Sequence, residues 1–172
     1  MENNLQTSNL ISFPSTILCE GIVLLVFAAY GDIKRLRIPN MLVAAVAVLG
    51  VLRLFVIGDL TTAVYTVGSS VIIFIMTFLL FWRGLLGGGD VKLLGATVLL
   101  VGYHNLFSFL FLMSICGALV SLVILFIHRY LPLHLGPRIA VLVPTARLSV
   151  PYGVAIAGGA IVTLLFQHSL LG

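Results

Sequence analysis

Long apolar segments follow one another along almost the whole chain. We interpret six of them, at 11–30, 41–57, 61–82, 91–103, 106–127 and 151–167, as membrane spans, because roughly 20 helical residues cross a bilayer core of about 30 Å. Only 8% of the residues are charged, against about a quarter in a soluble domain, so the chain cannot cover a water-facing surface. Short alternating strands are absent, and helices must therefore satisfy the backbone. The sequence predicts an all-α polytopic helical bundle that forms a single integral-membrane domain over residues 1–172.

The basic residues predict the orientation of this bundle. Eight of the nine fall at connections on one side: Lys34, Arg35, Arg37, Arg83, Lys92, Arg129, Arg138 and Arg147. The positive-inside rule makes that side the cytoplasm and places both termini outside. Because topology accounts for the net charge of +4, we expect membrane lipid and no nucleic acid as a partner. The first four residues carry no positive charge, so we expect the first span to be retained and not cleaved as a signal peptide.

Three of the five acidic residues, Glu20, Asp32 and Asp90, lie in or at the predicted spans. Ionisable groups within a bilayer are functional candidates by default. Asp32 follows the first span and Asp90 opens the fourth, so both are expected at the cytoplasmic face. Singly, Asp90 could be a helix N-cap and Asp32 an interfacial charge. Together, two close carboxyl groups share one proton, so that one can activate a water as base and the other can polarise a peptide carbonyl.

An uncharged, glycine-rich stretch at 84–89 precedes Asp90. The fourth span is short, so we expect this stretch to enter the membrane as non-helical backbone beside a water-filled cavity. Gly87, Gly88 and Gly89 have no side chains, and their backbone could approach an extended substrate and pair with it like a strand.

Three ordered motifs resemble those of the prepilin peptidases, which are Gly-x-Gly-Asp membrane aspartic proteases. Gly87-x-Gly89-Asp90 is followed by Val-Lys-Leu-Leu-Gly, and Asp32 stands six residues ahead of Ile-Pro-Asn at 38–40. Pro-Tyr-Gly at 151–153 opens the last span. The resemblance implies that Asp32 and Asp90 are catalytic. It also assigns a substrate-binding or backbone role to the remaining motif residues: Pro39, Asn40, Gly87, Gly88, Gly89, Lys92, Tyr152 and Gly153.

The resemblance also implies a substrate and a location. Prepilin peptidases cut the short basic leader from pilin-like precursors at the cytoplasmic face of the bacterial plasma membrane, and no cofactor is expected. Larger members carry an N-terminal domain with paired CxxC motifs and N-methylate the trimmed pilin. This chain has no such domain, so it resembles the short branch that serves Tad/Flp pili, and methylation is not expected. Archaeal preflagellin peptidases share the aspartates and remain an alternative.

Other polar residues have plainer interpretations. Glu20 and Arg53 are expected at similar depth on adjacent antiparallel helices, where they could form an ion pair; otherwise Arg53 extends toward the outer interface. Lys92 could contact lipid phosphates or act on the charge of Asp90. Cys19 and Cys116 are read as small membrane-buried side chains. The four histidines lie outside the spans without metal-ligand spacing, so no metal is expected.

Two other functions are compatible with the pattern. Paired aspartates and glycine-broken helices also occur in proton- or cation-coupled transporters, although no inverted repeat is visible and the aspartates lie toward one face. The second alternative function is that of a non-catalytic scaffold of a pilus machine. The connection at 128–150 is either a docking surface or a plain solvated link.

Overall fold

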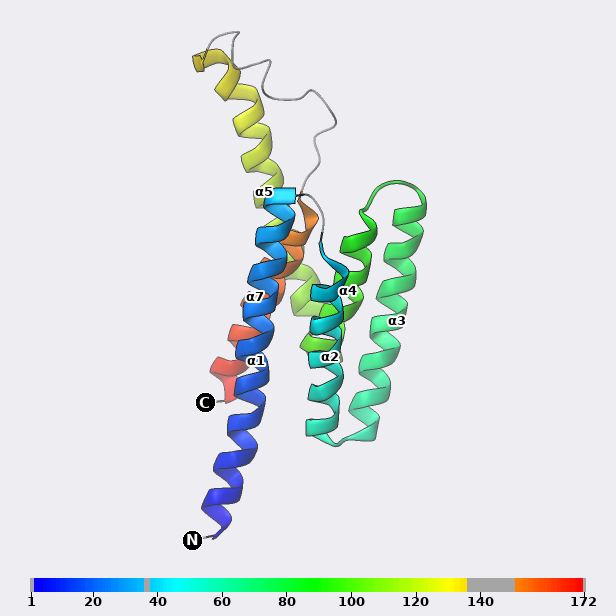
Figure 1. Cartoon of the computed structure of the whole chain (residues 1–172), viewed down its shortest axis with the longest axis vertical. Coiled ribbons are helices and arrows are strands. Elements are labelled where there is room, and N and C mark those ends of the chain that lie inside the picture. The colour runs from blue at the N-terminus through cyan, green and yellow to red at the C-terminus, as the bar shows by residue number, and fades with distance from the viewer. Residues whose placement is uncertain (1, 36–37, 136–150, 172) are drawn as a thin grey trace.

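The computed structural model describes residues 2–35, 38–135 and 151–171, and every regular element among them is helical (Figure 1). The helices are α1 (Glu2–Arg35), α2 (Asn40–Ile57), α3 (Leu60–Trp82), α4 (Gly88–Val101), the 3-10 turn η1 (Tyr103–Asn105), α5 (Leu106–Leu135) and α7 (Tyr152–Leu171). An α-helix therefore lies at each of the six predicted segments, and the all-α fold is confirmed.

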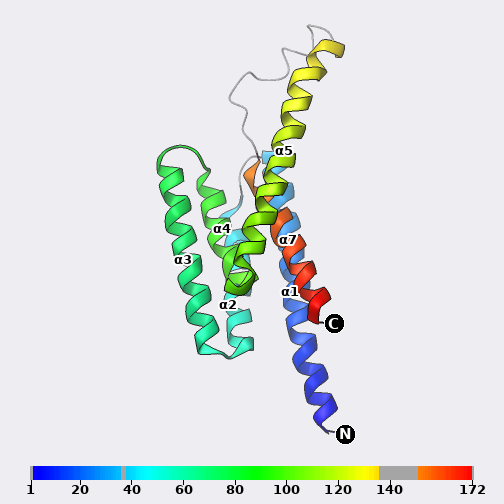
Figure 2. The same ribbon diagram turned by 180° about the vertical axis from the view of Figure 1, so that it is seen from behind.

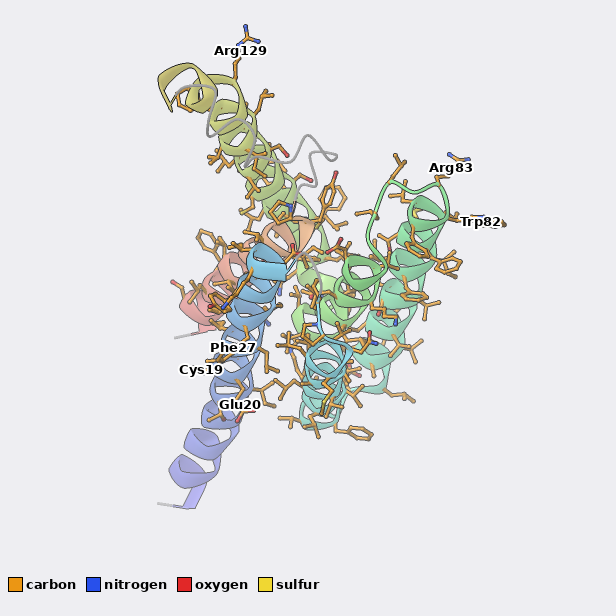
Figure 3. All side chains as sticks on the ribbon, turned by 45° about the horizontal axis from the view of Figure 1, so that its top comes forward. Cys19, Glu20, Phe27, Trp82, Arg83 and Arg129 are labelled. Atoms are coloured by element: carbon orange, nitrogen blue, oxygen red, sulfur yellow. The ribbon has the colours of Figure 1, made fainter. Side chains whose placement is uncertain are left out.

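The helices alternate in direction between two ends of the molecule. The N- and C-termini and the α2–α3 turn lie toward one end, whereas α1, α3 and α5 finish toward the other (Figures 1 and 2). Arg83 and Arg129 both lie at this second end (Figure 3). We call it the basic end.

Four segments are long and apolar enough to cross a membrane: Thr16–Lys34, Asn40–Ile57, Leu60–Trp82 and Tyr103–Phe126. The apolar part of α7, Tyr152–Gln167, is shorter. Helix α4 has 14 residues, which corresponds to a rise of about 20 Å. Four helices can thus cross a membrane by their length and composition, whereas α4 and the apolar part of α7 are shorter.

Helix α4 lies at the centre of the core. It packs against α2, α3 and α7, and Leu93, Val98 and Leu100 are fully buried. Large apolar side chains on α3 and α5, such as Met76 and Phe111, are exposed. Since lipid solvates apolar side chains, such exposure is expected of helices that line the outside of a membrane bundle.

Glycines let two pairs of helices cross closely. A Cβ added to Gly50 of α2 would lie 2.7 Å from Cβ of Leu99 and 2.9 Å from the backbone N of Leu100 on α4. A Cβ on Gly159 of α7 would lie 2.5 Å from the backbone N of Met113 on α5. Small residues at such crossings let helix backbones approach, which strengthens packing where lipid supplies no hydrophobic drive.

The α2–α3 turn is stabilised by its own residues. Gly58 ends α2 in the left-handed region with φ of 68°. Asp59 caps α3, and its carboxylate accepts hydrogen bonds from the N–H groups of Thr61 (3.2 Å) and Thr62 (2.9 Å). The hydroxyl and N–H of Thr62, followed by the N–H of Thr61, hold the pKa of Asp59 below its usual value.

Several helix boundaries differ from the prediction. Helix α1 continues to Arg35, so Asp32 lies in its last turn. Helix α4 begins at Gly88 because Gly87 forms an extended cap whose carbonyl accepts from the N–H groups of Asp90 and Val91. The expectation of non-helical backbone up to Asp90 is therefore wrong for Gly88 and Gly89, and Gly87, not Asp90, is the N-cap.

The connection predicted at 128–150 is partly helical, because α5 continues to Leu135. Its remainder, 136–150, lies outside the described residues, together with Arg138 and Arg147. The two interpretations of this connection, a docking surface or a plain solvated link, therefore concern mainly residues that the structure does not describe.

Candidate functional site

Asp32 is buried at the end of α1 and faces the start of α7. Only 5% of the residue is exposed. The N–H of Gly153, the second residue of α7, donates a hydrogen bond of 2.7 Å to its Oδ2, and the N–H of Val154 also interacts with the carboxylate. The first N–H groups of a helix have no partner within it, so Asp32 supplies from α1 the acceptor that α7 lacks.

Asp90 is half-buried in the first turn of α4. Its side chain turns back toward the cap residue and interacts with the backbone N–H of Gly87. Negative charge is favoured near a helix N-terminus, where the peptide dipoles point their positive ends. Each aspartate is thus held by a helix start, Asp90 by its own helix and Asp32 by another.

Asp32 and Asp90 lie near enough for the negative charge of Asp32 to act on Asp90. Helix α7 packs against both α1 and α4, so its first turn joins the two helices that carry them. Two carboxyl groups at short range cannot both ionise easily, and such a pair holds one proton. The charge interaction between Asp32 and Asp90 is compatible with such a shared proton.

The glycine run is packed against this chain's own side chains. A Cβ on Gly87 would lie 2.7 Å from Oδ2 of Asp90, one on Gly88 would lie 3.3 Å from the ring of Phe81, and one on Gly89 would lie 3.4 Å from Cβ of Ile38. Gly88 and Gly89 consequently allow the first turn of α4 to fit between α3 and Ile38, which precedes α2, and Gly87 leaves room for the carboxylate of Asp90. Their predicted contact with substrate backbone stays a prediction.

The Ile-Pro-Asn motif at 38–40 abuts the same turn. Pro39 caps α2, and its carbonyl accepts from the N–H of Leu42 at 3.0 Å. The amide oxygen of Asn40 accepts a hydrogen bond of 3.3 Å from Nζ of Lys92. Pro39, Asn40 and Lys92 are exposed, so they lie at the rim of the site. Tyr152 is likewise exposed at the start of α7, with Gly153 buried beside it.

Sequence reasoning missed Ile38 and Phe81 as residues that pack against the glycine run. Ile38 had a signal, because it belongs to the motif that follows Asp32. Phe81 had none, since it is one of several apolar residues in an apolar span.

The predicted Glu20–Arg53 ion pair is absent from the structure. Glu20 is exposed on α1 (Figure 3), whereas Nη1 of Arg53 is buried without a hydrogen-bond partner. The guanidinium lies against Gly102, at the end of α4. Gly21 faces Leu100 on α4, and because successive helical residues are about 100° apart, Glu20 is turned away from the core.

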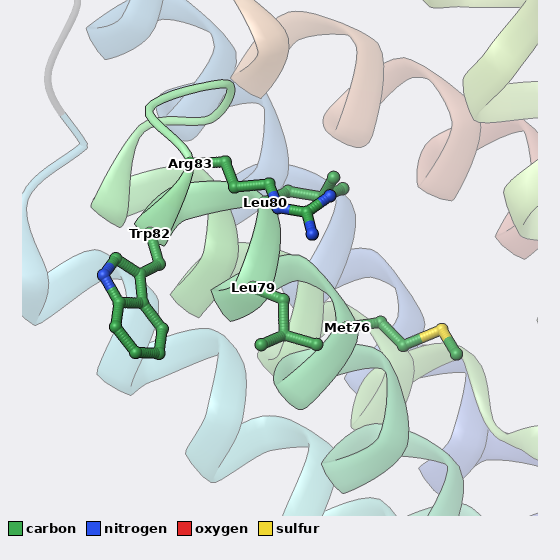
Figure 4. A pocket seen from close by; sticks show the side chains of 5 residues that line it. All are labelled: Met76, Leu79, Leu80, Trp82 and Arg83. Atoms are coloured by element: carbon green, nitrogen blue, oxygen red, sulfur yellow. The ribbon is translucent and has the colours of Figure 1, made fainter.

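Two hollows lie along α3. One of 640 Å³ follows the last turns of α3 and is lined by Met76, Leu79, Leu80, Trp82 and Arg83 (Figure 4). Another, of 430 Å³, lies between α2, α3 and α4 below Lys92. In the described part of the chain, no three His, Cys, Asp or Glu side chains converge as metal ligands would.

These features define a class of protein: a helical membrane bundle with two interacting carboxyl groups at its basic end. The model of the type IV leader peptidase family matches residues 19–122, which is more than half of the chain. The chain belongs to the type IV leader peptidase family, and it is therefore a member of a membrane peptidase family. No curated protein and no solved structure matches it.

Proposed function

We propose that this protein is an aspartic endopeptidase that removes the short basic leader from pilin-like precursors. The observation that supports the proposal is that the charge of Asp32, on helix α1, acts on Asp90, on helix α4. Both aspartates lie within the part of the chain that the family model matches. The whole chain acts as one integral-membrane peptidase domain, without a metal or other cofactor.

The reaction is the hydrolysis of a peptide bond by an activated water. One carboxylate takes a proton from the water as its oxygen bonds to the scissile carbonyl carbon, and the other carboxyl gives its proton to the carbonyl oxygen. When the tetrahedral intermediate collapses, the carbon–nitrogen bond breaks, the first carboxyl gives the proton it took from water to the leaving amine, and a hydroxyl of the intermediate returns a proton to the second carboxylate. The two carboxyl groups thereby exchange roles within one turnover.

We place the site at the cytoplasmic face of the bacterial plasma membrane. This orientation is supported by the basic residues Arg83 and Arg129, which share the end of the bundle at which α1 finishes and α4 begins (Figures 1 and 3). Basic residues accumulate on the cytoplasmic side of membrane proteins.

Co-expression with a candidate pilin precursor tests the proposal. We expect the wild-type protein to shorten the precursor on a gel and Asp32→Asn and Asp90→Asn each to abolish this shift, because a pair reduced to one carboxyl group cannot supply both base and acid. Glu20→Gln is the matched control, since it removes an exposed carboxylate from α1 and should leave cleavage unchanged. Near-normal trimming by either aspartate variant at equal membrane abundance would rule out the pair mechanism.

A further inference from the structure

We infer that Gly153 is a positioning residue, whose N–H holds Asp32 as the ionised member of the carboxyl pair and leaves the shared proton on Asp90. This inference rests on the proposed peptidase function and assigns different roles to its two aspartates. It also gives α7, which lies beyond the residues that the family model matches, a part in the site.

The first argument is the set of donors around Asp32. Its Oδ2 accepts the 2.7 Å hydrogen bond from the N–H of Gly153, and the N–H of Val154 also interacts with the carboxylate. A hydrogen bond from a backbone N–H to a carboxylate is shorter and stronger than one to a neutral acceptor. The positive end of the α7 dipole acts in the same sense. Burial of Asp32 acts against its charged form, and all of these interactions act against that cost in favour of the charge.

The second argument is the poorer set of donors around Asp90. Among the backbone groups of the described residues it interacts with a single N–H, that of Gly87 in its own helix cap. The charge on Asp32 opposes a second charge beside it. The proton of the pair therefore resides on Asp90. In the reaction Asp32 takes the proton from the attacking water, and Asp90 gives its proton to the carbonyl oxygen of the scissile bond.

The third argument is the absence of space for a side chain at residue 153. An added Cβ would lie 2.7 Å from Oδ2, 2.9 Å from Cγ and 3.0 Å from Cβ of Asp32, whereas ordinary contacts begin at 3.4 Å. An alanine would force the carboxylate to move by about 0.7 Å, the difference between 3.4 and 2.7 Å. A misplacement of about 1 Å in an active site can lower the rate about 100-fold.

Steady-state kinetics on the purified full-length protein test the positioning role, with a synthetic precursor peptide as substrate. We expect Gly153→Ala to lower kcat at least about tenfold and to leave KM within about twofold, because the carboxylate moves while the substrate surface stays intact. Gly158→Ala is the matched control on the same helix, since its Cβ would meet only the side chain of Cys116, with the movable Sγ at 3.3 Å and Cβ at 3.6 Å. An unchanged kcat for Gly153→Ala, or a raised KM alone, would overturn the inference.

Thermal unfolding tests the charge assignment without any cleavage. Asparagine resembles a protonated aspartate, so Asp90→Asn should leave Tm unchanged or raise it. Asp32→Asn should lower Tm by roughly 2–4 °C, the change expected for a loss of about 1 kcal/mol in a chain of this size. The reverse order would place the proton on Asp32 and overturn the assignment. If both asparagine variants still cleaved the precursor, the proposed function would fail, and the Tm order would still decide where the charge resides.

Discussion

At the scale of single residues, three described glycines have positive φ: Gly58, Gly84 and Gly102. Gly102 is the most constrained of them. Its φ of 86° and ψ of 157° fall in a region that is essentially open to glycine alone. A Cβ there would also lie 2.6 Å from Nη1 of Arg53. Gly58, with φ of 68° and ψ of 4°, has open space around it.

Gly102 and Gly58 give a matched pair of predictions about stability. Gly102→Ala should destabilise the protein by about 2–3 kcal/mol because it combines backbone strain with a displaced guanidinium. Gly58→Ala should cost about 1 kcal/mol, the ordinary penalty of a left-handed residue with a side chain. Differential scanning fluorimetry in detergent would compare their Tm values. Equal losses would mean that the contact with Arg53 adds nothing to the stability of the folded chain.

The residue scale also shows what the sequence could predict. Asp32 and Asp90 stand out because ionisable groups are rare in apolar segments. The pairing of Glu20 with Arg53 was wrong because depth along a helix does not fix rotation about it, and a step of one residue turns a side chain by about 100°. The donor at Gly153 could not be predicted as a contact of Asp32, since a backbone N–H has no sequence signal of its own.

At the scale of elements, α4 carries Asp90 and is positioned by its neighbours. Gly50 sets its distance from α2, the hydroxyl of Ser70 on α3 donates a 2.8 Å hydrogen bond to the carbonyl of Gly95, and α7 packs along it. Apolar length alone located this helix in the sequence. Its start at Gly88 was not predictable from length, because the helix begins wherever Gly87 can form the cap and Ile38 and Phe81 leave room for the next turn.

A larger residue in place of Gly50, at the α2–α4 crossing, should push these two helices apart and lower the stability of the fold. Gly50→Ala places a methyl group against backbone atoms of Leu99 and Leu100, which cannot move like a flexible side chain, so we expect a loss of about 1–3 kcal/mol, typical of overpacking. Gly68→Ala on α3 meets nothing within 4 Å and should leave Tm unchanged or raise it, because alanine favours a helix over glycine by about 1 kcal/mol. Thermal unfolding of both variants would check this, and equal Tm values would refute the close crossing.

At the scale of the whole molecule, the alternation of helices brings distant segments to one end. The end of α1 and the starts of α4 and α7 meet there, although they lie far apart in the sequence (Figure 1). The charge pattern predicted this arrangement well, since Arg83 and Arg129 share the basic end (Figure 3). It could not predict how far α5 continues, because that helix keeps its apolar character to Phe126 and only then becomes mixed.

The last prediction concerns the orientation of the bundle in the membrane. If the basic end faces the cytoplasm, the α2–α3 turn faces outward, and the two ends must differ in their access to an impermeant reagent. In a chain with Cys19→Ser and Cys116→Ser, a single cysteine at the exposed Leu60 or at the exposed Arg83 reports on each end. We expect a charged maleimide to label Leu60→Cys in intact spheroplasts and to label Arg83→Cys only after lysis.

The labelling pattern bears directly on the proposed function, because the proposed basic leader lies at the cytoplasmic face and a carboxyl pair could cut it only from that side. Both variants should react after lysis, which controls for local exposure of each cysteine. Labelling of Arg83→Cys in intact spheroplasts, with Leu60→Cys protected until lysis, would invert the bundle. Asp32 and Asp90 would then face away from the leader, and cleavage of cytoplasmic precursors by this pair would be impossible.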